Sequence, residues 1–220
     1  MNAWPEVAGP SPATEPALAA LLAQLRREHR DAVRAVLLYG SCLRSGDLFD
    51  GLVDLYLIVD SYRSAYGRSW LALANRLLPP NVFYAQCAVE GRTLRSKVTV
   101  ISLEDFRRGC SRRWFQAYLW GRFSQPVRIV YARDQETTVA ITDAFRQAAA
   151  TLLGRALPAL PASGSLGGLW EQALALSYGT ELRTERPGRA RELVIAALPF
   201  YEAVTRLVAA ALPHGLELAG

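Results

Sequence analysis

Residues 37–60 read LLYGSCLRSGDLFDGLVDLYLIVD, and this stretch decides the fold. It contains most of two runs rich in Val, Leu and Tyr, 32–39 and 52–59, and such runs are typical of buried β-strands. A polar segment that begins at Gly40 separates them, and the second run carries one carboxylate, Asp54. The pattern predicts two strands joined by a loop, with an acidic side chain near the start of the second strand.

The loop and the acidic strand residue together suit the binding of a triphosphate. Glycine at position 40 lets the backbone approach a phosphate, and the Ser41 hydroxyl can donate to phosphate oxygens. A strand carboxylate is costly to bury unless it is paired or metal-bound, and Mg²⁺ prefers carboxylate oxygens, so Asp54 is a candidate metal ligand. Nucleotidyltransferase sites are laid out in this way, but they usually carry a second carboxylate two places further along, where this chain has Tyr56. The alternative is an isolated strand Asp at an exposed edge.

The composition is that of a globular protein that prefers anionic partners. Of 220 residues, 51% are hydrophobic, which is enough for one sizeable core or two small domains. The formal net charge of +5 favours nucleotides, nucleic acid or acidic lipid surfaces. Alternatively, the excess of arginine reflects only a GC-rich genome.

The N-terminal residues and the spacing of the cysteines bear on the cellular location. The three cysteines have no CxxC spacing, which fits free thiols in a reducing compartment and, with only two histidines, argues against structural zinc. The first residues have no secretory or mitochondrial leader pattern, and the apolar runs are too short to span a bilayer. We expect a cytoplasmic protein, with peripheral contact at the inner face of an acidic membrane as an open alternative.

The rest of the chain predicts a small mixed sheet followed by helices. Leu18, Leu21, Leu22 and Leu25 follow helical spacing in a helix that ends near His29. The further predicted elements are a helix 70–78, strands 82–89 and 95–102 around a turn at 90–93, helices 103–109 and 112–123, a strand 127–131, and helices 136–153, 169–178 and 189–212. The fold class is therefore α/β (α+β), a nucleotidyltransferase-like palm with a mixed sheet and a smaller, mostly helical module after it.

Three parts are expected along the chain. They are a flexible leader 1–15, a nucleotidyltransferase-like domain 16–133 and a helical C-terminal module 134–220. Within the last part, Pro, Gly and Ser cluster without any period in 156–168, which makes this segment the best linker candidate.

Two basic residues are candidates for contact with a triphosphate. Lys97 is the one lysine among 25 basic residues, and strand alternation places it on one face with Thr99 and Ile101. A retained lysine suggests a compact, mobile charge for a phosphate, although a solvated strand lysine is the plain alternative. Arg122, near the end of an aromatic-rich helix, either contacts a phosphate or interacts with the carbonyls of its own helix end.

A later group of arginines is a candidate for binding an anionic acceptor. A predicted helix begins after the pair Pro187-Gly188 with Arg189 and Arg191 in its first turn. Arg183 precedes this pair, and Glu181 lies close to these arginines in the sequence. This group is either a phosphate-binding surface or a solvated basic face.

Several motifs, in order, resemble the mitochondrial-type phosphatidate cytidylyltransferases, also called translocator assembly and maintenance proteins, and their bacterial relatives. The similar segments are Tyr39-Gly40-Ser41-Cys42, Asp54-Leu55-Tyr56, Lys97 to Ser102, Tyr118 to Val127 and Leu176 to Arg183, with Arg189 and Arg191 in place of paired lysines. The resemblance covers roughly residues 32 to 210. The family makes CDP-diacylglycerol from CTP and phosphatidic acid.

The resemblance implies a Mg²⁺-dependent transfer of a cytidylyl group, with CTP and phosphatidic acid or another anionic acceptor as partners. The implied catalytic residues are Asp54, Lys97 and Glu181, of which Asp54 and Glu181 would bind metal. The implied nucleotide-binding residues are Gly40, Ser41, Lys97 and Arg122, and the implied acceptor-binding residues are Tyr178, Arg183, Arg189 and Arg191. The family also has an apolar residue two places after the Asp, as this chain has at Tyr56.

Three departures from the family and three alternatives remain at this point. The loop between Ser41 and Asp54 and the C-terminal tail are both shorter than expected of mitochondrial members. Cys42 stands where the family has glycine, and Glu181 where it has Asp; Asp47, Asp50 and Asp105 are weaker candidates for the second carboxylate. The alternatives are a nucleotidyltransferase with a small-molecule or protein acceptor, a degenerate non-catalytic nucleotide- or partner-binding module, and nucleic-acid binding. Nucleic acid is not expected, because the arginines are spread along the chain instead of forming one stripe.

Overall fold

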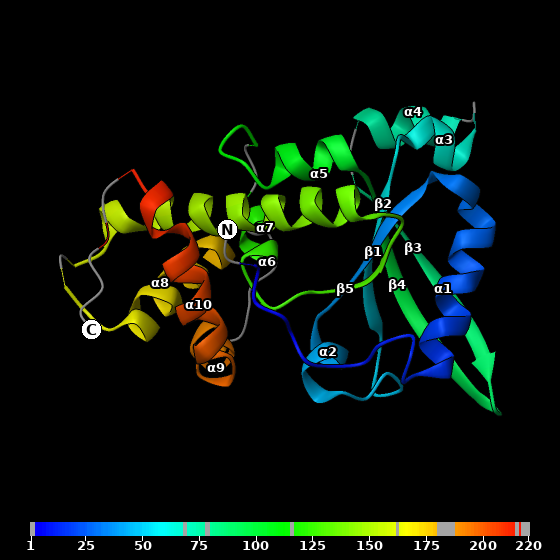
Figure 1. Cartoon of the computed structure of the whole chain (residues 1–220), viewed down its shortest axis with the longest axis horizontal. Helices are drawn as coiled ribbons and strands as arrows, with labels where there is room; N and C mark the ends of the chain where they lie inside the picture. Colours follow the sequence, from blue (N-terminus) through cyan, green and yellow to red (C-terminus); the bar gives the residue numbers. More distant parts are fainter. Residues whose placement is uncertain are drawn as a thin grey trace. The chain divides into compact units, whose positions relative to one another are not determined.

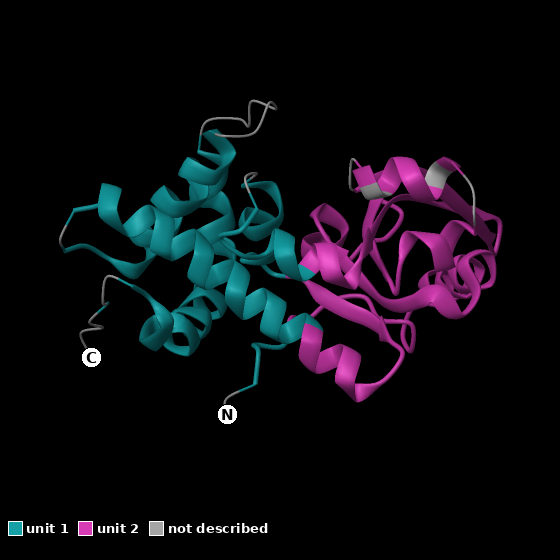
Figure 2. Cartoon of the chain, turned by 90° about the horizontal axis from the view of Figure 1, so that it is seen from above, with its two compact units in different colours: residues 1–6, 107–126, 141–220 teal, residues 7–106, 127–140 magenta. Residues whose placement is uncertain are grey.

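The computed structural model describes residues 3–67, 70–77, 80–114, 117–161, 163–179, 188–213 and 216. The chain divides into two compact units (Figure 2). The sheet unit comprises Val7–Phe106 and Val127–Ala140, and the helical unit comprises Met1–Glu6, Arg107–Pro126 and Ile141–Gly220.

A mixed five-stranded sheet forms the centre of the sheet unit (Figure 1). Its strands lie in the order β3-β4-β2-β1-β5. β2 pairs in parallel with β4, and the other neighbouring strands pair antiparallel. The bounds are β1 Val33–Tyr39, β2 Val53–Val59, β3 Asn81–Val89, β4 Arg92–Ser102 and β5 Arg128–Ala132. The predicted mixed sheet is confirmed.

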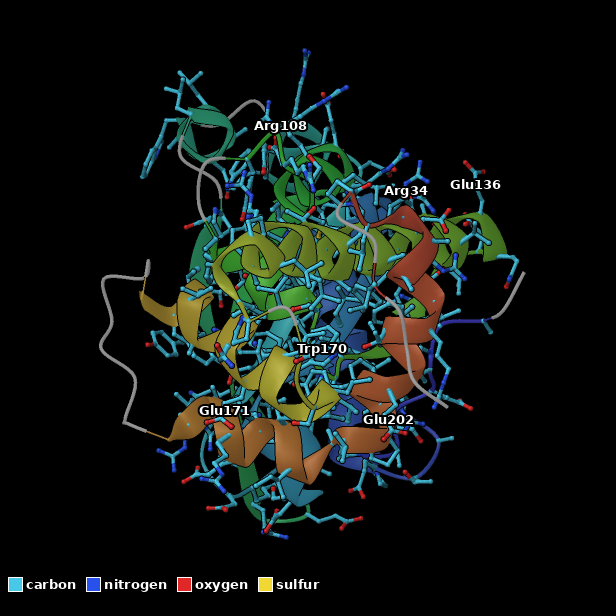
Figure 3. The ribbon with its side chains drawn as sticks, turned by 90° about the vertical axis from the view of Figure 1, so that its left-hand side faces the viewer. Arg34, Arg108, Glu136, Trp170, Glu171 and Glu202 are labelled. Atoms are coloured by element: carbon cyan, nitrogen blue, oxygen red, sulfur yellow. The ribbon has the colours of Figure 1, made fainter. Side chains whose placement is uncertain are left out.

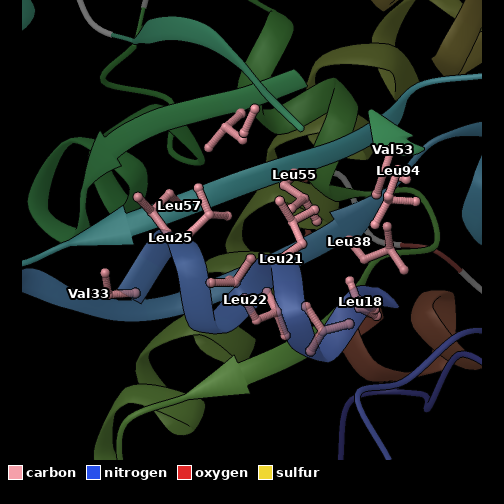
Figure 4. Close-up of a cluster of buried hydrophobic side chains, with 14 of the residues drawn as sticks. Leu18, Leu21, Leu22, Leu25, Val33, Leu38, Val53, Leu55, Leu57 and Leu94 are labelled. Carbon is pink, nitrogen blue, oxygen red and sulfur yellow. The ribbon is translucent and has the colours of Figure 1, made fainter. Parts of the chain in front are cut away.

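One face of the sheet is covered by α1, Pro16–His29 (Figure 4). Leu18, Leu21 and Leu25 of α1 are fully buried, as the i, i+3, i+7 spacing predicts. They share a core with Leu55 and Leu57, which point to this face because side chains alternate along β2. The other side chains of β2, among them Asp54, therefore point to the opposite face.

Besides α1, the sheet unit includes α2 Ser41–Ser45, α3 Tyr62–Tyr66, α4 Trp70–Leu77 and the first residues of α5 Leu103–Gly109. A 3-10 turn, Arg30–Ala32, leads from α1 into β1. The sequence predicted α4 and α5 but placed α2 inside a loop and gave no helix at α3. At α3 a capping box explains the short helix, since Ser61 and Ser64 each accept from the backbone N–H of the other.

The helical unit contains α6 Tyr118–Phe123, most of α7 Gln135–Ala156, α8 Leu166–Gly179, α9 Arg189–Ala196 and α10 Leu198–Val208, with 3-10 turns Leu157–Ala159 and Ala209–Ala211. Trp170 lies in the interior of this unit and Glu171 and Glu202 at its surface (Figure 3). The indole Nε1 of Trp170 donates to Thr205 Oγ1 at 2.8 Å, and its ring lies 4.6 Å from that of Tyr201. Packing of aromatic side chains thus defines a second core.

The expected division of the chain differs from the one in the structure. Residues 107–126 were expected in the sheet domain, but they group with the helical unit. The reason is aromatic packing, because the ring of Phe123 stacks on that of Phe145 at 5.8 Å. The described residues of the predicted leader contact the folded chain. The Trp4 ring lies 5.5 Å from the Phe145 ring, and Arg128 Nη1 donates to the carbonyl oxygen of Val7 at 2.9 Å.

Three predicted elements need correction. The hairpin turn is shorter than 90–93, since only Glu90 and Gly91 lie outside the strands and both have positive φ, 52° and 73°. The helix predicted at 112–123 begins only at Tyr118. The helix predicted at 189–212 is broken at Ala197, because Pro199 has no backbone N–H to continue the hydrogen bonds of α9 and is tolerated in the first turn of a new helix, α10.

Within the described residues, no single helix is both long and apolar enough to cross a membrane. α9 and the segment Leu198–Ala211 meet that criterion only as a pair, with a bend of 85° between them.

Candidate functional site

A row of four side chains crosses the sheet on the face turned away from α1. Asp54 is the register partner of Tyr39 on β1 and of Lys97 on β4, and Lys97 is the partner of Tyr84 on β3. Register partners point to the same face, and neighbouring strands lie about 4.8 Å apart. The sheet therefore places a carboxylate and an ammonium group side by side at the start of β2, and both side chains are half-buried.

Gly40 follows β1 and packs directly against the carboxylate of Asp54. Its backbone has φ 86° and ψ −155°, a conformation that L side chains rarely adopt. A Cβ at this position would lie 2.5 Å from Asp54 Oδ2. The carboxylate thus occupies the space of the missing side chain, and the exposed Ser41 begins α2 directly beyond it. This contact holds an acidic group against the backbone of the loop.

The donor set at this site fits Mg²⁺ held jointly with a nucleotide and does not fit a cage made of protein ligands alone. Within the described part of the chain, no three His, Cys, Asp or Glu side chains come together as metal ligands. Asp54 offers hard carboxylate oxygens, and Mg²⁺ is commonly held by one or two carboxylates, substrate phosphates and waters. Glu181, the predicted second ligand, lies outside the described residues.

Two of the weaker carboxylate candidates have structural roles. The backbone N–H of Phe49 donates to Asp47 Oδ1 at 2.8 Å, which closes a turn in the loop. Asp105 is buried, and its Oδ2 accepts from the Tyr62 hydroxyl at 2.7 Å. β4 ends at Ser102, five residues and roughly 16 Å along the strand from Lys97, and Asp105 lies beyond that end. It is therefore no partner for Asp54.

Cys42 closes the loop between β1 and β2. The side chain is buried in the core on the α1 face. Its thiol donates to the carbonyl oxygens of Leu52 at 3.3 Å and Asp50 at 3.6 Å. Burial raises the pKa of the Cys42 thiol, and the nearby carboxylate of Asp54 raises it further. The neutral thiol thus joins the two ends of the loop, a contact that the family's glycine cannot make.

Tyr56 packs where a second strand carboxylate would stand. It is completely buried, and its ring lies 5.3 Å from the ring of Tyr39. Its register partner Thr99 is also buried, and the Thr99 hydroxyl has no hydrogen-bond partner among the described residues. This position is built for packing and offers no metal ligand.

In the helical unit, the motif around Gly121 on α6 and the motif around Ser177 on α8 come together, although they are far apart in the sequence. A Cβ on Gly121 would lie 2.7 Å from Ser177 Oγ, so α6 and α8 are in close contact there. The hydroxyl of Tyr178 donates to Gln125 Oε1 at 3.2 Å, and Gln125 Nε2 donates to the carbonyl oxygen of Gly121 at 2.9 Å. The half-buried Arg122 lies beside this network in the chain.

We expect Gly121→Ala to lower the free energy of unfolding by about 1–3 kcal/mol, because the added methyl group overlaps Ser177 and forces α6 and α8 apart. The matched control is Gly167→Ala in α8, where the nearest atom to an added Cβ is 3.8 Å away. Chemical denaturation would measure both. Equal stability of the two variants would contradict close packing at Gly121.

The predicted acceptor-side arginines are only partly described. Arg189 Nη1 lies 3.3 Å from Glu192 Oε2 at the start of α9, an exposed pair that contributes little to stability. Arg191 is exposed, and Arg183 lies outside the described residues together with Glu181. The structure therefore leaves the predicted acceptor cluster untested.

Tyr84 is a site residue that the sequence did not reveal. It is exposed on the edge strand β3, directly beside Lys97. The strand itself was predicted, but its register against β4 was not. A two-residue turn fixes the register of a hairpin. Counting residue pairs outward from the turn at Glu90-Gly91 would therefore have placed Tyr84 opposite Lys97.

Three comparisons with known proteins were made, and one of them identifies a family. The family described as mitochondrial phosphatidate cytidylyltransferase matches residues 60–198, more than half of the chain. No curated protein matches the chain. Among solved structures, a nucleotidyltransferase-like protein from Exiguobacterium sibiricum 255-15 is similar at 13% identity and a TM-score of 0.36, over 88% of this chain and 75% of the other.

Proposed function

Since the chain belongs to the family of mitochondrial phosphatidate cytidylyltransferases, which are nucleotidyltransferases, we propose that it transfers a cytidylyl group from CTP to phosphatidic acid. The products would be CDP-diacylglycerol and pyrophosphate. The observation that supports the proposal most directly is the packing of Asp54 against Gly40, with Lys97 as its register partner.

The reaction forms one bond and breaks one bond. A phosphate oxygen of phosphatidic acid attacks the α-phosphorus of CTP, and the bond from the α-phosphorus to the bridging oxygen of pyrophosphate breaks, with the electron pair leaving on pyrophosphate. When bound, Mg²⁺ would neutralise charge on the triphosphate, and Asp54 would hold it. Lys97 and Arg122 would offset the remaining negative charge, while Gly40 and Ser41 let the phosphates approach the backbone.

A phosphate acceptor needs no general base to become a nucleophile. The second pKa of a phosphate monoester is about 6, so its oxygen is already ionised at neutral pH. A hydroxyl acceptor would instead need a base to take its proton. His29, the histidine within the described residues, lies on the α1 face with its ring 5.7 Å from Tyr66 and 5.8 Å from Phe83. It is on the opposite face from Asp54, so His29 is not placed to act as a base beside that carboxylate.

The remaining assignments belong to the same proposal. Tyr178, Arg183, Arg189 and Arg191 would bind the acceptor phosphate, and Glu181 would supply the second metal-binding carboxylate. We propose a cytoplasmic enzyme that meets its lipid substrate by peripheral contact with an acidic membrane. The positive net charge of +5 supports this contact.

The choice of acceptor is tested by supplying CTP, ATP, GTP or UTP with Mg²⁺ and vesicles that contain phosphatidic acid. We expect mass spectrometry to detect CDP-diacylglycerol from CTP and no comparable product from the other nucleotides. Diacylglycerol, which has the same chains but no phosphate, is the matched control and should give no product. Nucleotidyl transfer that needs no lipid would show instead that the acceptor is a different molecule.

A further inference from the structure

Two cationic side chains of β4 lie on the sheet face that carries Asp54. Arg95 is exposed and precedes the half-buried Lys97 by two residues, so both side chains point to this face, roughly 7 Å apart along the strand. The residue between them points the other way, because Ser96 is buried and its hydroxyl donates to the carbonyl oxygen of Val53 at 2.8 Å. β4 thus presents two positive charges beside the candidate metal ligand.

Neither of these cations has an acidic partner among the described residues. Arg95 and Lys97 take part in none of the ion pairs or side-chain hydrogen bonds of the described chain. β3 and β4 contain no Asp or Glu, and Glu90, in the turn between them, lies more than roughly 10 Å along the strand from Arg95. Asp54 faces them from the neighbouring strand β2. Two such cations suit an anion that arrives from solution.

The order of the strands gives this anion a place in the proposed reaction. Gly40 and Ser41 follow β1 on one side of Asp54, and β4 lies on the other side, because the sheet runs β4-β2-β1. In such a transfer the attacking and the leaving oxygens lie roughly in line, on opposite sides of the phosphorus. With the pyrophosphate end of CTP at Gly40 and Ser41, the acceptor oxygen would approach from the side of β4.

The charge of the acceptor also calls for cations on this side. A phosphate monoester carries between one and two negative charges at neutral pH, and the triphosphate of CTP is an anion as well, so the two repel each other at short distance. Arginine suits a phosphate because it can donate two parallel N–H···O bonds to it. Positive charge at Arg95 and Lys97 would therefore lower the cost of bringing the two anions together.

We propose that Arg95 and Lys97 bind the phosphate of the acceptor, a phosphate monoester. Lys97, the register partner of Asp54, would lie beside both the nucleotide and the acceptor, whereas Arg95 would contact the acceptor alone. On β3 the register partners Gln86 and Tyr84 are exposed and offer amide and hydroxyl donors. The word acceptor rests on the proposed function; the placement of the two cations does not.

Initial rates of the full chain with CTP, Mg²⁺ and dihexanoyl phosphatidic acid, which is dispersed in water, test this assignment. We expect Arg95→Gln to raise the KM for phosphatidic acid about tenfold or more, because a hydrogen bond between charged groups is lost. The KM for CTP and the kcat at saturating phosphatidic acid should stay close to the parental values.

The matched control is Arg92→Gln, which removes an exposed arginine from the same strand. Arg92 points to the opposite face of the sheet, where its guanidinium group lies over the Phe49 ring, 3.7 Å from the ring centroid. Arg92→Gln lowers the net charge by the same amount as Arg95→Gln, but it should leave both KM values unchanged.

Binding of glycerol phosphate in the absence of CTP measures the subsite apart from turnover. Calorimetry should show that Arg95→Gln binds glycerol phosphate at least about tenfold more weakly than the parent chain and binds CTP with Mg²⁺ equally well. Such a result supports the subsite whether or not the chain turns over a lipid.

Glycerol phosphate as an acceptor also separates the two sources of a phosphate monoester. Turnover of phosphatidic acid but not of glycerol phosphate, with the predicted effect of Arg95→Gln, supports a lipid phosphate at the subsite. Turnover of glycerol phosphate with the same effect supports a water-soluble acceptor there. If the parent turns over neither compound, the proposed function fails, while calorimetry still tests the subsite.

Several results would overturn the subsite. One is a parental KM for the acceptor in Arg95→Gln, and another is an equal rise in the KM for CTP, which would place Arg95 on the nucleotide. An equal loss in Arg92→Gln would show an effect of net charge alone. Failure of the parent chain to bind glycerol phosphate would also contradict the proposal.

Discussion

Asp54→Asn is expected to lower turnover at least about 10³-fold, which corresponds to roughly 4 kcal/mol of transition-state stabilisation. Asparagine has nearly the same shape, so the contact with Gly40 and the pairing with Lys97 on β4 remain while the negative charge is lost. The Mg²⁺-dependent part of CTP affinity should disappear as well, because an amide is a much weaker ligand for a hard cation. Initial rates and calorimetry with and without Mg²⁺ measure the two effects.

The control for this variant is Asp60→Asn, which removes the same charge directly after the far end of β2. Asp60 Oδ2 pairs with Arg133 Nη1 at 2.9 Å and Oδ1 with Arg34 Nε at 2.5 Å. The hydrogen bond from Arg133 lowers the pKa of Asp60. The ion pair therefore stabilises the folded parent at pH values above the usual pKa of Asp, and this stability is lost as the pH falls through the lowered pKa. Asp60→Asn should therefore remove the small part of the free energy of unfolding that depends on this ion pair, and it should leave turnover unchanged. Parental turnover in Asp54→Asn would remove Asp54 from the site.

The strands and the first helix could be predicted because each has one buried face. Leu18, Leu21 and Leu25 mark the buried face of α1 by their spacing alone, and β1 and β2 were placed to within one residue. Both patterns are local, since a period of 3.6 or 2 residues appears within a few turns or pleats. For the same reason, strand alternation alone assigns Asp54 to the face of β2 that it shares with Tyr56.

The pairing of Asp54 with Lys97 could not be predicted, because it depends on contacts between distant segments. Parallel pairing of β2 with β4 sets this register, and α3, α4 and β3 all lie between the two strands in the sequence. Strand periodicity gives the face of each residue but not the neighbouring strand. The sequence therefore predicts which residue types form the site, but only the order of the strands in the sheet shows that Asp54 and Lys97 are neighbours.

Local hydrogen bonds explain the helix that began later than expected. The aromatic spacing in 112–123 is helical, but Ser111 Oγ donates to the carbonyl oxygen of Arg108 at 2.7 Å and accepts from the backbone N–H of Arg113 at 3.2 Å. Such serine contacts compete with helical hydrogen bonds and form a turn after α5. The five-residue α2 was missed for a different reason: it is too short to show a helical period.

Gly40→Ala is expected to lower turnover about 10²-fold or more. Its Cβ would lie 2.5 Å from Asp54 Oδ2, so either the carboxylate or the loop must move, and displacement of a reacting group by about 1 Å can cost that much. The backbone at φ 86° and ψ −155° adds strain of about 1–3 kcal/mol, which should appear as a lower free energy of unfolding. Kinetics and chemical denaturation of the same preparation measure both effects.

Gly46→Ala separates the strain from the displaced carboxylate. Gly46 lies in the same loop at φ 77°, but no atom comes within 4 Å of a Cβ added there. Because alanine is also strained at this φ, Gly46→Ala should lose about 1 kcal/mol of stability and keep parental turnover. If Gly46→Ala lost as much turnover as Gly40→Ala, loop strain alone would account for the defect. If Gly40→Ala kept parental turnover, the position of the Asp54 carboxylate against the loop would not matter for the reaction.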